Sequence, residues 1–197
     1  MSYASLDDLK ESLRITDTED DTLLQVALDA AKELIDEHCN RTFDVLAAPE
    51  TRIFEPELGV VEIDDIYDST GLVFTVDGVA IPVAVPNVSA GYRLLPRNAP
   101  QKGEPYTSIS YETYPFGFPF LFSGIRGHVA IATQFWGYAA VVPESVRQAN
   151  LLQASRIFAR RLAPFGVAGS PELGSEIRLL SKVDPDVAVL LSGKVRY

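Results

Sequence analysis

The stretch DDTLLQVALDAAKELIDEHC, residues 20–39, decides the predicted fold of this chain. Its apolar residues recur every three or four positions, which predicts a helix with one face against a core. That face comprises Leu24, Ala27, Leu28, Ala31, Leu34 or Ile35, and His38. A helix from Asp20 to His38 would be roughly 28 Å long, and Asn40 and Arg41 follow as its predicted exit.

A shorter helix is predicted just before this one. Ser5, with Asp8 three positions later, has the pattern of a capping box at a helix N-terminus. The next apolar stripe comprises Leu6, Leu9 and Leu13. The acidic connection 16–21 then suits the start of the second helix, where the helix dipole favours negative charge.

A third helix is predicted to begin at Pro143, because proline is tolerated at the first helical position. Two neighbouring apolar stripes follow: Leu151, Ala154, Phe158 and Leu162 on one, and Val146, Ala149, Gln153 and Ile157 on the other. Pro164 and Gly166 end the helix. Residues 1–45 and 143–163 are therefore predicted to form a small helical bundle.

Residues 46–142 have the character of β-structure, with short apolar runs such as GVVEIDDIY and HVAIATQFWGY. Asp77-Gly78, between Val76 and Val79, predicts a tight hairpin. No helical pattern of convincing length interrupts this region, which argues against a parallel α/β sheet. The predicted fold class is α+β: a helical bundle, an antiparallel β insertion that forms a sheet or a small barrel, and an extended C-terminal tail.

The tail, residues 164–197, is predicted to contain a strand at 176–183 and a short helix near Asp184-Pro185. It is too apolar for a disordered linker. It must therefore pack on something, either its own domain or a neighbouring molecule.

The composition predicts a soluble intracellular protein whose core needs no metal or disulfide. The chain has 197 residues and a single cysteine, Cys39, which excludes an internal disulfide. A chain of this length buries about 70% of its unfolded surface. Its first residues lack the basic and apolar regions of a signal peptide, and no run reaches the ~18 apolar residues of a membrane helix.

The formal net charge of −10 is unevenly distributed along the chain. Residues 1–68 hold 5 basic and 19 acidic groups, residues 69–142 hold 4 and 3, and residues 143–197 hold 8 and 5. The uneven charge fits a solvated acidic face, or an acidic end and a mildly basic end that suit head-to-tail packing between copies. A net acidic chain is a poor candidate for gripping nucleic acid through its phosphates.

No catalytic, cofactor-binding or metal-binding residues are predicted. His38 and Cys39 are adjacent on a helix, so their side chains point about 100° apart and do not form a nucleophile–base pair. His128 and the pair Asp64-Asp65 carry no motif that marks them for catalysis. The acidic run 17–21 begins like a calcium loop, but Thr22 and Leu28 stand where such a loop needs glycine and a bidentate acid.

Two other clusters are candidate contact surfaces. Arg156, Arg160 and Arg161 could bind phosphate or DNA, but pairing with carboxylates of a neighbouring copy is the favoured interpretation. The segment 111–122 has six aromatic residues interrupted by proline and glycine, so it does not form one regular strand. We expect this aromatic loop to dock on another subunit or partner, through Phe116, Phe118, Phe120 and Phe122.

Several of these segments, in this order, resemble the head–tail connector (adaptor) proteins of tailed phages. YASLDDLKESL and then residues 20–43 resemble the start of that family. WGYAAVVPESVRQANLLQASRIFARR, from Trp136, is similar to its strand-into-helix pattern. GVAGSPELGSEIRLLSKVDPDVAVLL is similar to connectors of phages and prophages of actinobacteria. The resemblance covers residues 3–43 and 124–197.

The resemblance implies a structural virion protein and not an enzyme. Family members form a ring, usually dodecameric, beneath the portal vertex, where they join the DNA-filled head to the stopper or tail terminator. DNA passes through the ring without specific binding, and no membrane is involved. The protein would be located in the neck of the virion after assembly in the host cytoplasm. The alternatives are another neck component, such as a stopper or tail-completion protein, or a small hydrolase or ligand-binding β protein of the host.

Two sets of residues acquire expected roles from this resemblance. Acidic residues on the polar face of the second helix would line or approach the DNA channel: Asp29, Glu33, Asp36 and Glu37. The segment 183–191 would face the portal or clasp a neighbouring subunit, with Val187, Leu190 and Leu191 as its contact residues. Acidic walls would repel the phosphates and keep DNA from binding in the passage.

Overall fold

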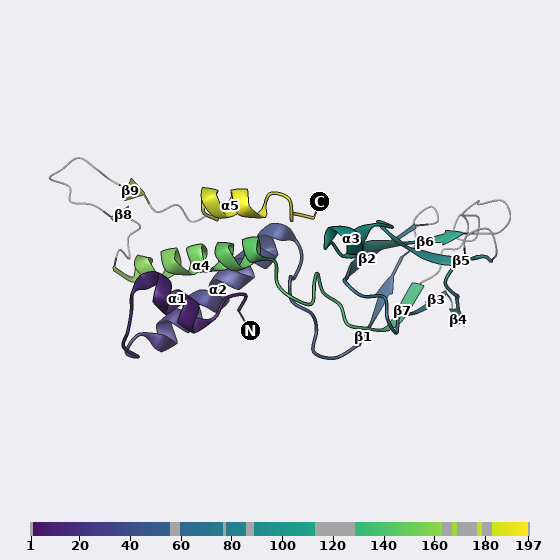
Figure 1. Cartoon of the computed structure of the whole chain (residues 1–197), viewed down its shortest axis with the longest axis horizontal. Helices are drawn as coiled ribbons and strands as arrows, with labels where there is room; N and C mark the ends of the chain where they lie inside the picture. Colours follow the sequence, from purple (N-terminus) through teal and green to yellow (C-terminus); the bar gives the residue numbers. More distant parts are fainter. Residues whose placement is uncertain are drawn as a thin grey trace. The chain divides into compact units, whose positions relative to one another are not determined.

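The computed structural model describes residues 2–55, 60–76, 78–85, 89–112, 129–162, 167–168, 177–178 and 183–196. It divides into a helical unit, Met1–Phe43 with Val142–Tyr197, and a β unit, Asp44–Val141. Helices and antiparallel sheets occur together, so the predicted α+β class is confirmed (Figure 1). In the described residues we find no helix with the length and apolar character needed to cross a membrane.

The described residues of the helical unit form four helices. They are α1 (Leu6–Leu13), α2 (Asp21–Cys39), α4 (Glu144–Ala159), which runs into the 3-10 turn η1 (Arg160–Leu162), and α5 (Pro185–Leu191). The predicted capping box is present: the Ser5 hydroxyl accepts from the Asp8 N–H, and the Asp8 carboxylate accepts from the Ser5 N–H. The predicted short helix near residue 184 is also present, because Asp184 caps α5.

Helix α4 lies between α1 and α2 on one side and α5 on the other (Figure 1). Because neighbours cover several of its faces, its buried residues include both apolar and polar side chains. They are Val146, Ala149, Asn150, Leu151, Gln153 and Ala154. This central position explains why two apolar stripes, and not one, are present in its sequence.

The predicted stripe of α2 is buried, with one correction at its end. Leu24, Ala27, Leu28, Ala31 and Ile35 are all buried, but the next buried residue is Cys39 and not His38. Cys39 follows Ile35 by four positions and so lies above it on the same face, whereas His38 remains partly exposed.

Two antiparallel sheets are present in the part of the β unit that the structure describes. One has the strand order β1 (Glu50–Phe54), β7 (Val129–Gln134), β3 (Val73–Val76), β4 (Val79–Ala80); the other has β2 (Val60–Ile66), β6 (Tyr106–Glu112), β5 (Gly91–Leu95). A short helix, α3 (Ala99–Lys102), follows β5. The predicted hairpin is confirmed, because Val76 pairs with Val79 and Gly78 has a φ of +79°.

Both sheets contribute to one core, in which aliphatic and aromatic side chains pack together. Its buried members are Val61, Ile63, Ile66, Phe74, Val76, Tyr92, Ile109 and Trp136. The Trp136 indole N–H donates to the Glu50 carbonyl oxygen at 2.9 Å, which fixes its orientation. Gly137 then allows a close approach of two chain segments, since a Cβ there would lie 2.3 Å from the Asp44 carbonyl oxygen.

The C-terminal part of the chain divides into a short strand pair and α5. The strands β8 (Val167–Ala168) and β9 (Ile177–Arg178) pair with each other. Of the strand expected at 176–183, residues 177–178 form β9, and the other described residue, Val183, is not in a strand. The sequence left open whether the tail packs on its own domain or on a neighbour; α5 packs on α4 of the same chain.

Candidate functional site: exposed surfaces of the helical unit

An acidic stripe runs along the C-terminal half of α2. Asp29, Glu33 and Glu37 are spaced four residues apart, which places them on one face of the helix, and all three are exposed. The Asp29 carboxylate accepts from Gln25 Nε2 at 3.1 Å. These three residues are called the acidic stripe below.

Asp36, the fourth acid expected on this surface, has a different role. Its carboxylate accepts from the Tyr3 hydroxyl and, at 3.0 Å, from Lys32 Nζ. The Tyr3 hydroxyl also accepts from the Phe43 N–H at 2.8 Å. Asp36 therefore links the start of the chain to the end of α2 through a hydrogen bond. Its helical spacing did not indicate this structural role.

The same face of α2 is apolar near its N-terminus. Leu23 is 52% exposed and Val26 is 60% exposed, although the rest of the apolar residues in this helix are directed to the core or only partly exposed. Val26 precedes Asp29 by three positions, so the apolar patch and the acidic stripe are continuous. Leu23 and Val26 lie off the main apolar stripe of α2, and this position in the sequence is the signal from which the patch could have been predicted.

The arginine cluster at the end of α4 contacts carboxylates of its own chain. Arg156 forms an ion pair with Asp184 next to α5, and Arg161 lies 2.8 Å from Asp20 before α2. The Arg161 guanidinium also lies 3.7 Å from the centre of the Phe158 ring. We expected these arginines to meet carboxylates of a neighbouring copy; for Arg156 and Arg161 the described partners are intramolecular. Arg160 lies in η1, directly after α4.

The charge difference between the two ends of the sequence is thus partly compensated within the helical unit. Arg161 with Asp20, and Arg147 with Asp8 at 3.1 Å, each join the acidic N-terminal segment to the basic C-terminal segment. Both ends of the sequence belong to one folded unit, and head-to-tail packing between copies stays a prediction.

The expected partner residues of the tail divide into two groups. Val187 and Leu191 are fully buried, so in this chain they form the contact of α5 with its own helical unit and not a partner surface. Leu190 is partly exposed, and its neighbour Val189 is 73% exposed. The helical period explains the division, since residues 187 and 191 share the inner face and residues 189 and 190 lie off it.

Two buried amides of α4 organise the elements around it. The Asn150 carbonyl oxygen accepts from the Ala4 N–H at 3.1 Å, and its amide donates to the Leu28 carbonyl oxygen at 3.1 Å. The Gln153 side-chain oxygen accepts from the Asp184 N–H at 3.3 Å. Sequence reasoning did not single out Asn150, whose burial depends on contacts that are distant along the chain.

The groups with potential chemical reactivity are few. Cys39 is fully buried, and burial raises the pKa of its thiol to about 11, so it is protonated near neutral pH. Over the described ranges, no cluster of three or more His, Cys, Asp or Glu side chains has an arrangement that could hold a metal ion. His128 and the aromatic loop residues Phe116, Phe118, Phe120 and Phe122 lie outside the described residues.

Residues 3–68 match the model of a family described as phage gp6-like head-tail connector protein. The match confirms, over these residues, the resemblance to head–tail connectors found in the sequence. No curated protein matches the chain.

Two solved structures resemble the whole chain. A chain of "Neck of empty GTA particle computed with C6 symmetry" has a TM-score of 0.55 and 18% sequence identity, and the match covers 99% of this chain and 90% of that one. The fold is therefore shared along nearly the full length. A chain of "Virion of native gene transfer agent (GTA) particle" has 20% identity, coverage of 92% and 94%, and a TM-score of 0.41.

Proposed function

We propose that this chain is a subunit of a ring in the neck of a virion, where it joins the portal to the stopper or tail terminator. The observation that carries this proposal is the family match over residues 3–68, because that segment contains α1, α2 and both exposed surfaces of α2. The proposed location is the head–tail interface, after assembly in the host cytoplasm. The proposed role is mechanical and requires no catalytic group.

The proposed ring has twelve copies. The C6 symmetry with which the similar neck was computed is compatible with twelve chains. A closed ring requires two different surfaces on each subunit, since every copy meets one neighbour on each side. The exposed pair Leu23 and Val26 supports a role for α2 in one of these contacts, because exposed apolar side chains gain most from burial against a neighbour. Leu190 and Val189 on α5 are candidates for a second contact, with the portal or the adjacent subunit.

The acidic stripe is proposed to line the DNA channel. A passage that lets DNA move in both directions must not hold it, and a basic wall would bind the phosphates by releasing their counterions. Carboxylates repel the phosphates over about 8–10 Å at physiological ionic strength. The exposure of Asp29, Glu33 and Glu37 leaves their charge available for this purpose.

The assembly proposal is tested by measuring the mass of the purified chain alone and with its portal protein, followed by imaging of the complex. The expected result is a ring of twelve chains on the portal. A chain that remains monomeric and ignores the portal would contradict the proposal. The variant L23S/V26S is expected to retain its helical circular dichroism but to lose the ring.

The channel proposal is tested by charge reversal of the acidic stripe in assembled particles. The variant D29K/E33K/E37K is expected to form rings that retain DNA, with packaging or ejection slowed at low salt. The matched control is D7K/E11K/E19K, which makes the same change in charge at three exposed acids outside α2. Equal DNA transit in both variants would contradict a channel role for the stripe.

A further inference from the structure

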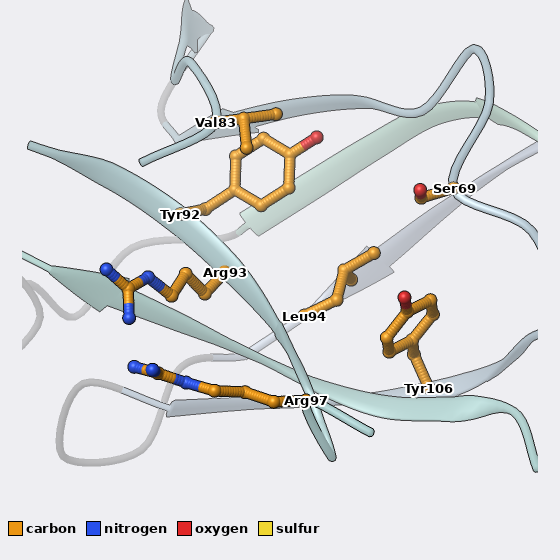
Figure 2. Close-up of a pocket in the computed structure, with 7 residues that line it drawn as sticks. All are labelled: Ser69, Val83, Tyr92, Arg93, Leu94, Arg97 and Tyr106. Atoms are coloured by element: carbon orange, nitrogen blue, oxygen red, sulfur yellow. The ribbon is translucent and has the colours of Figure 1, made fainter. Parts of the chain in front are cut away.

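A pocket of about 240 Å³ lies beside β5, and its residues are already engaged within the β unit (Figure 2). Arg93 and Arg97, the charged residues of its lining, both have interaction partners, and Tyr92 is buried in the core of the β unit. A different exposed surface lies in the helical unit, on α4.

This surface of α4 has Leu152 at its centre, a large apolar side chain that is 47% exposed. Gln148 and Ala159 are exposed as well, and Ser145 and Ser155 are partly exposed. The five positions alternate in steps of three and four residues, so they form one line along the helix. All five residues are uncharged, and together they are called the α4 face below.

The α4 face is directed away from α2. The Asn150 amide donates to the Leu28 carbonyl oxygen in α2, and Ala154 belongs to the same buried cluster as Leu28. Asn150 and Ala154 each lie two positions from Leu152, which corresponds to about 200° around an α-helix. Leu152 is therefore on the side of α4 opposite α2.

The apolar patch of α2 is directed the other way. Val26 is exposed, whereas Leu24 and Leu28, two positions before and after it, are fully buried. By the same helical period, Val26 points away from the core that α2 shares with α4. Val26 and Leu152 consequently lie on opposite sides of the packed pair of helices.

The distribution of charge favours contact between these two different faces. Two copies joined through α2 alone would bring two acidic stripes to one interface, where like charges repel. From Ser145 to Ala159, in contrast, α4 contains two arginines and no acidic residue. Both arginines have carboxylate partners within the chain, so they supply no free charge. The acidic end of a neighbouring α2 would nevertheless meet no carboxylate of α4.

We propose that the α4 face of one subunit receives Leu23 and Val26 of the next subunit. This contact rests on the proposed ring and specifies both of its surfaces. A closed ring joins each subunit to its two neighbours through two different surfaces, and the opposite directions of Val26 and Leu152 meet this requirement. Burial of the exposed leucine and valine side chains against Leu152 stabilises the contact.

The form of the two faces suits a helix-to-helix contact. Ser145 and Ser155, on either side of Leu152, have small side chains, and the larger side chains of a facing helix fit into the grooves beside such residues. The acidic stripe begins at Asp29, about one turn after Val26. It therefore lies beyond the apolar part of the contact, in agreement with its proposed position in the channel.

The contact is tested by cross-linking between two single-site variants. A V26C chain and an affinity-tagged L152C chain are mixed in equal amounts, assembled with the portal protein, and treated with a short bismaleimide. The natural Cys39 is fully buried, so the introduced cysteines react selectively. The product that joins V26C to L152C should be at least tenfold more abundant than either homotypic product. The control K102C, at an exposed residue of the β unit, replaces V26C and should give only background linkage.

A second pair of variants tests whether the contact is needed for assembly. L152S should retain its helical circular dichroism, because Leu152 is exposed, but should lose the ring. The matched control V79S makes the same kind of change at an exposed valine of the β unit and should still form rings. The double variant V26C/L152C should give a ladder of linked chains that ends at the size of the ring.

The outcomes separate this contact from the connector proposal. Rings that give no V26C–L152C product, or mainly homotypic products, would overturn the contact and leave the connector proposal intact. V26C–L152C products from chains that never close into a ring would support the contact and contradict the ring. Absence of both the product and the ring would contradict both proposals.

Discussion

The helical unit and the β unit stabilise their interiors in different ways. In the helical unit, small and aliphatic residues such as Leu9, Leu24, Leu28 and Ala31 fill the core, and buried amides of α4 connect the surrounding segments. The core of the β unit is more aromatic and contains Phe74, Tyr92 and Trp136. Aromatic rings fill the space between two sheets, whereas closely packed helices favour smaller side chains.

The difference suggests that the two units can be perturbed separately, because each has its own core. The sequence offers one reporter for each. The single tryptophan, Trp136, lies in the β core, and the single cysteine, Cys39, is buried in the helical unit. Unfolding of the β unit should change the indole emission, and opening of the helical unit should expose the thiol to modification.

The largest effect is expected from Phe74→Ala in the β unit. Removal of a fully buried phenylalanine leaves a cavity and should lower the free energy of unfolding by about 4 kcal/mol. The urea transition followed by Trp136 emission should move to lower urea, while the transition followed by helical circular dichroism should stay in place. The control Val79→Ala, at a 64% exposed side chain, should change little. Equal shifts of both transitions would show that the units unfold together.

The next effect is expected from Asn150→Ala in the helical unit. This change leaves the Ala4 N–H and the Leu28 carbonyl without the partners that Asn150 supplies, at a cost of about 2–4 kcal/mol. Modification of Cys39 should become faster in native conditions, and Trp136 emission should stay unchanged. Gln148→Ala on the exposed part of the same helix is the matched control. An unchanged rate of Cys39 modification would show that the Asn150 side chain does not limit the opening of the helical unit.

The smallest effect is the pH dependence of a surface pair. Hydrogen bonds from Arg147, and then from Gln148, lower the pKa of Glu144 from 4.5 to about 2. Since the folded-state pKa is lowered, the carboxylate contributes stability above pH 4.5, and this contribution is lost as the pH falls toward 2. In Arg147→Gln the pKa should return toward 4.5, as measured by NMR titration of Glu144.

The conservative variant Arg147→Lys sharpens this measurement. Arg147 donates from Nε at 2.9 Å and from Nη2 at 2.8 Å to the two oxygens of Glu144. Lysine keeps the charge but cannot make both contacts in this geometry, so an intermediate pKa is expected. If the two variants give the same pKa, the paired geometry has no role in the shift.

The sequence correctly predicted those elements that form through interactions between residues close together along the chain. The capping box at Ser5, the three-to-four-residue period of α2 and the turn at Gly78 all depend on residues that are close along the chain. The order of these elements also supported the resemblance to head–tail connectors, which the family match over residues 3–68 confirmed. The acidic stripe was predicted for the same reason, since helical period alone places residues 29, 33 and 37 together.

The sequence by itself therefore determined the α+β class, the approximate positions of the helices and the resemblance to head–tail connectors. Only the tertiary structure decided which of the predicted contact residues remain exposed. Arg156, Asp36 and Val187 have partners within the chain, and each partner or neighbouring element is far away in sequence. Helical spacing defines the face on which a side chain lies, but packing between distant segments determines whether that face is covered.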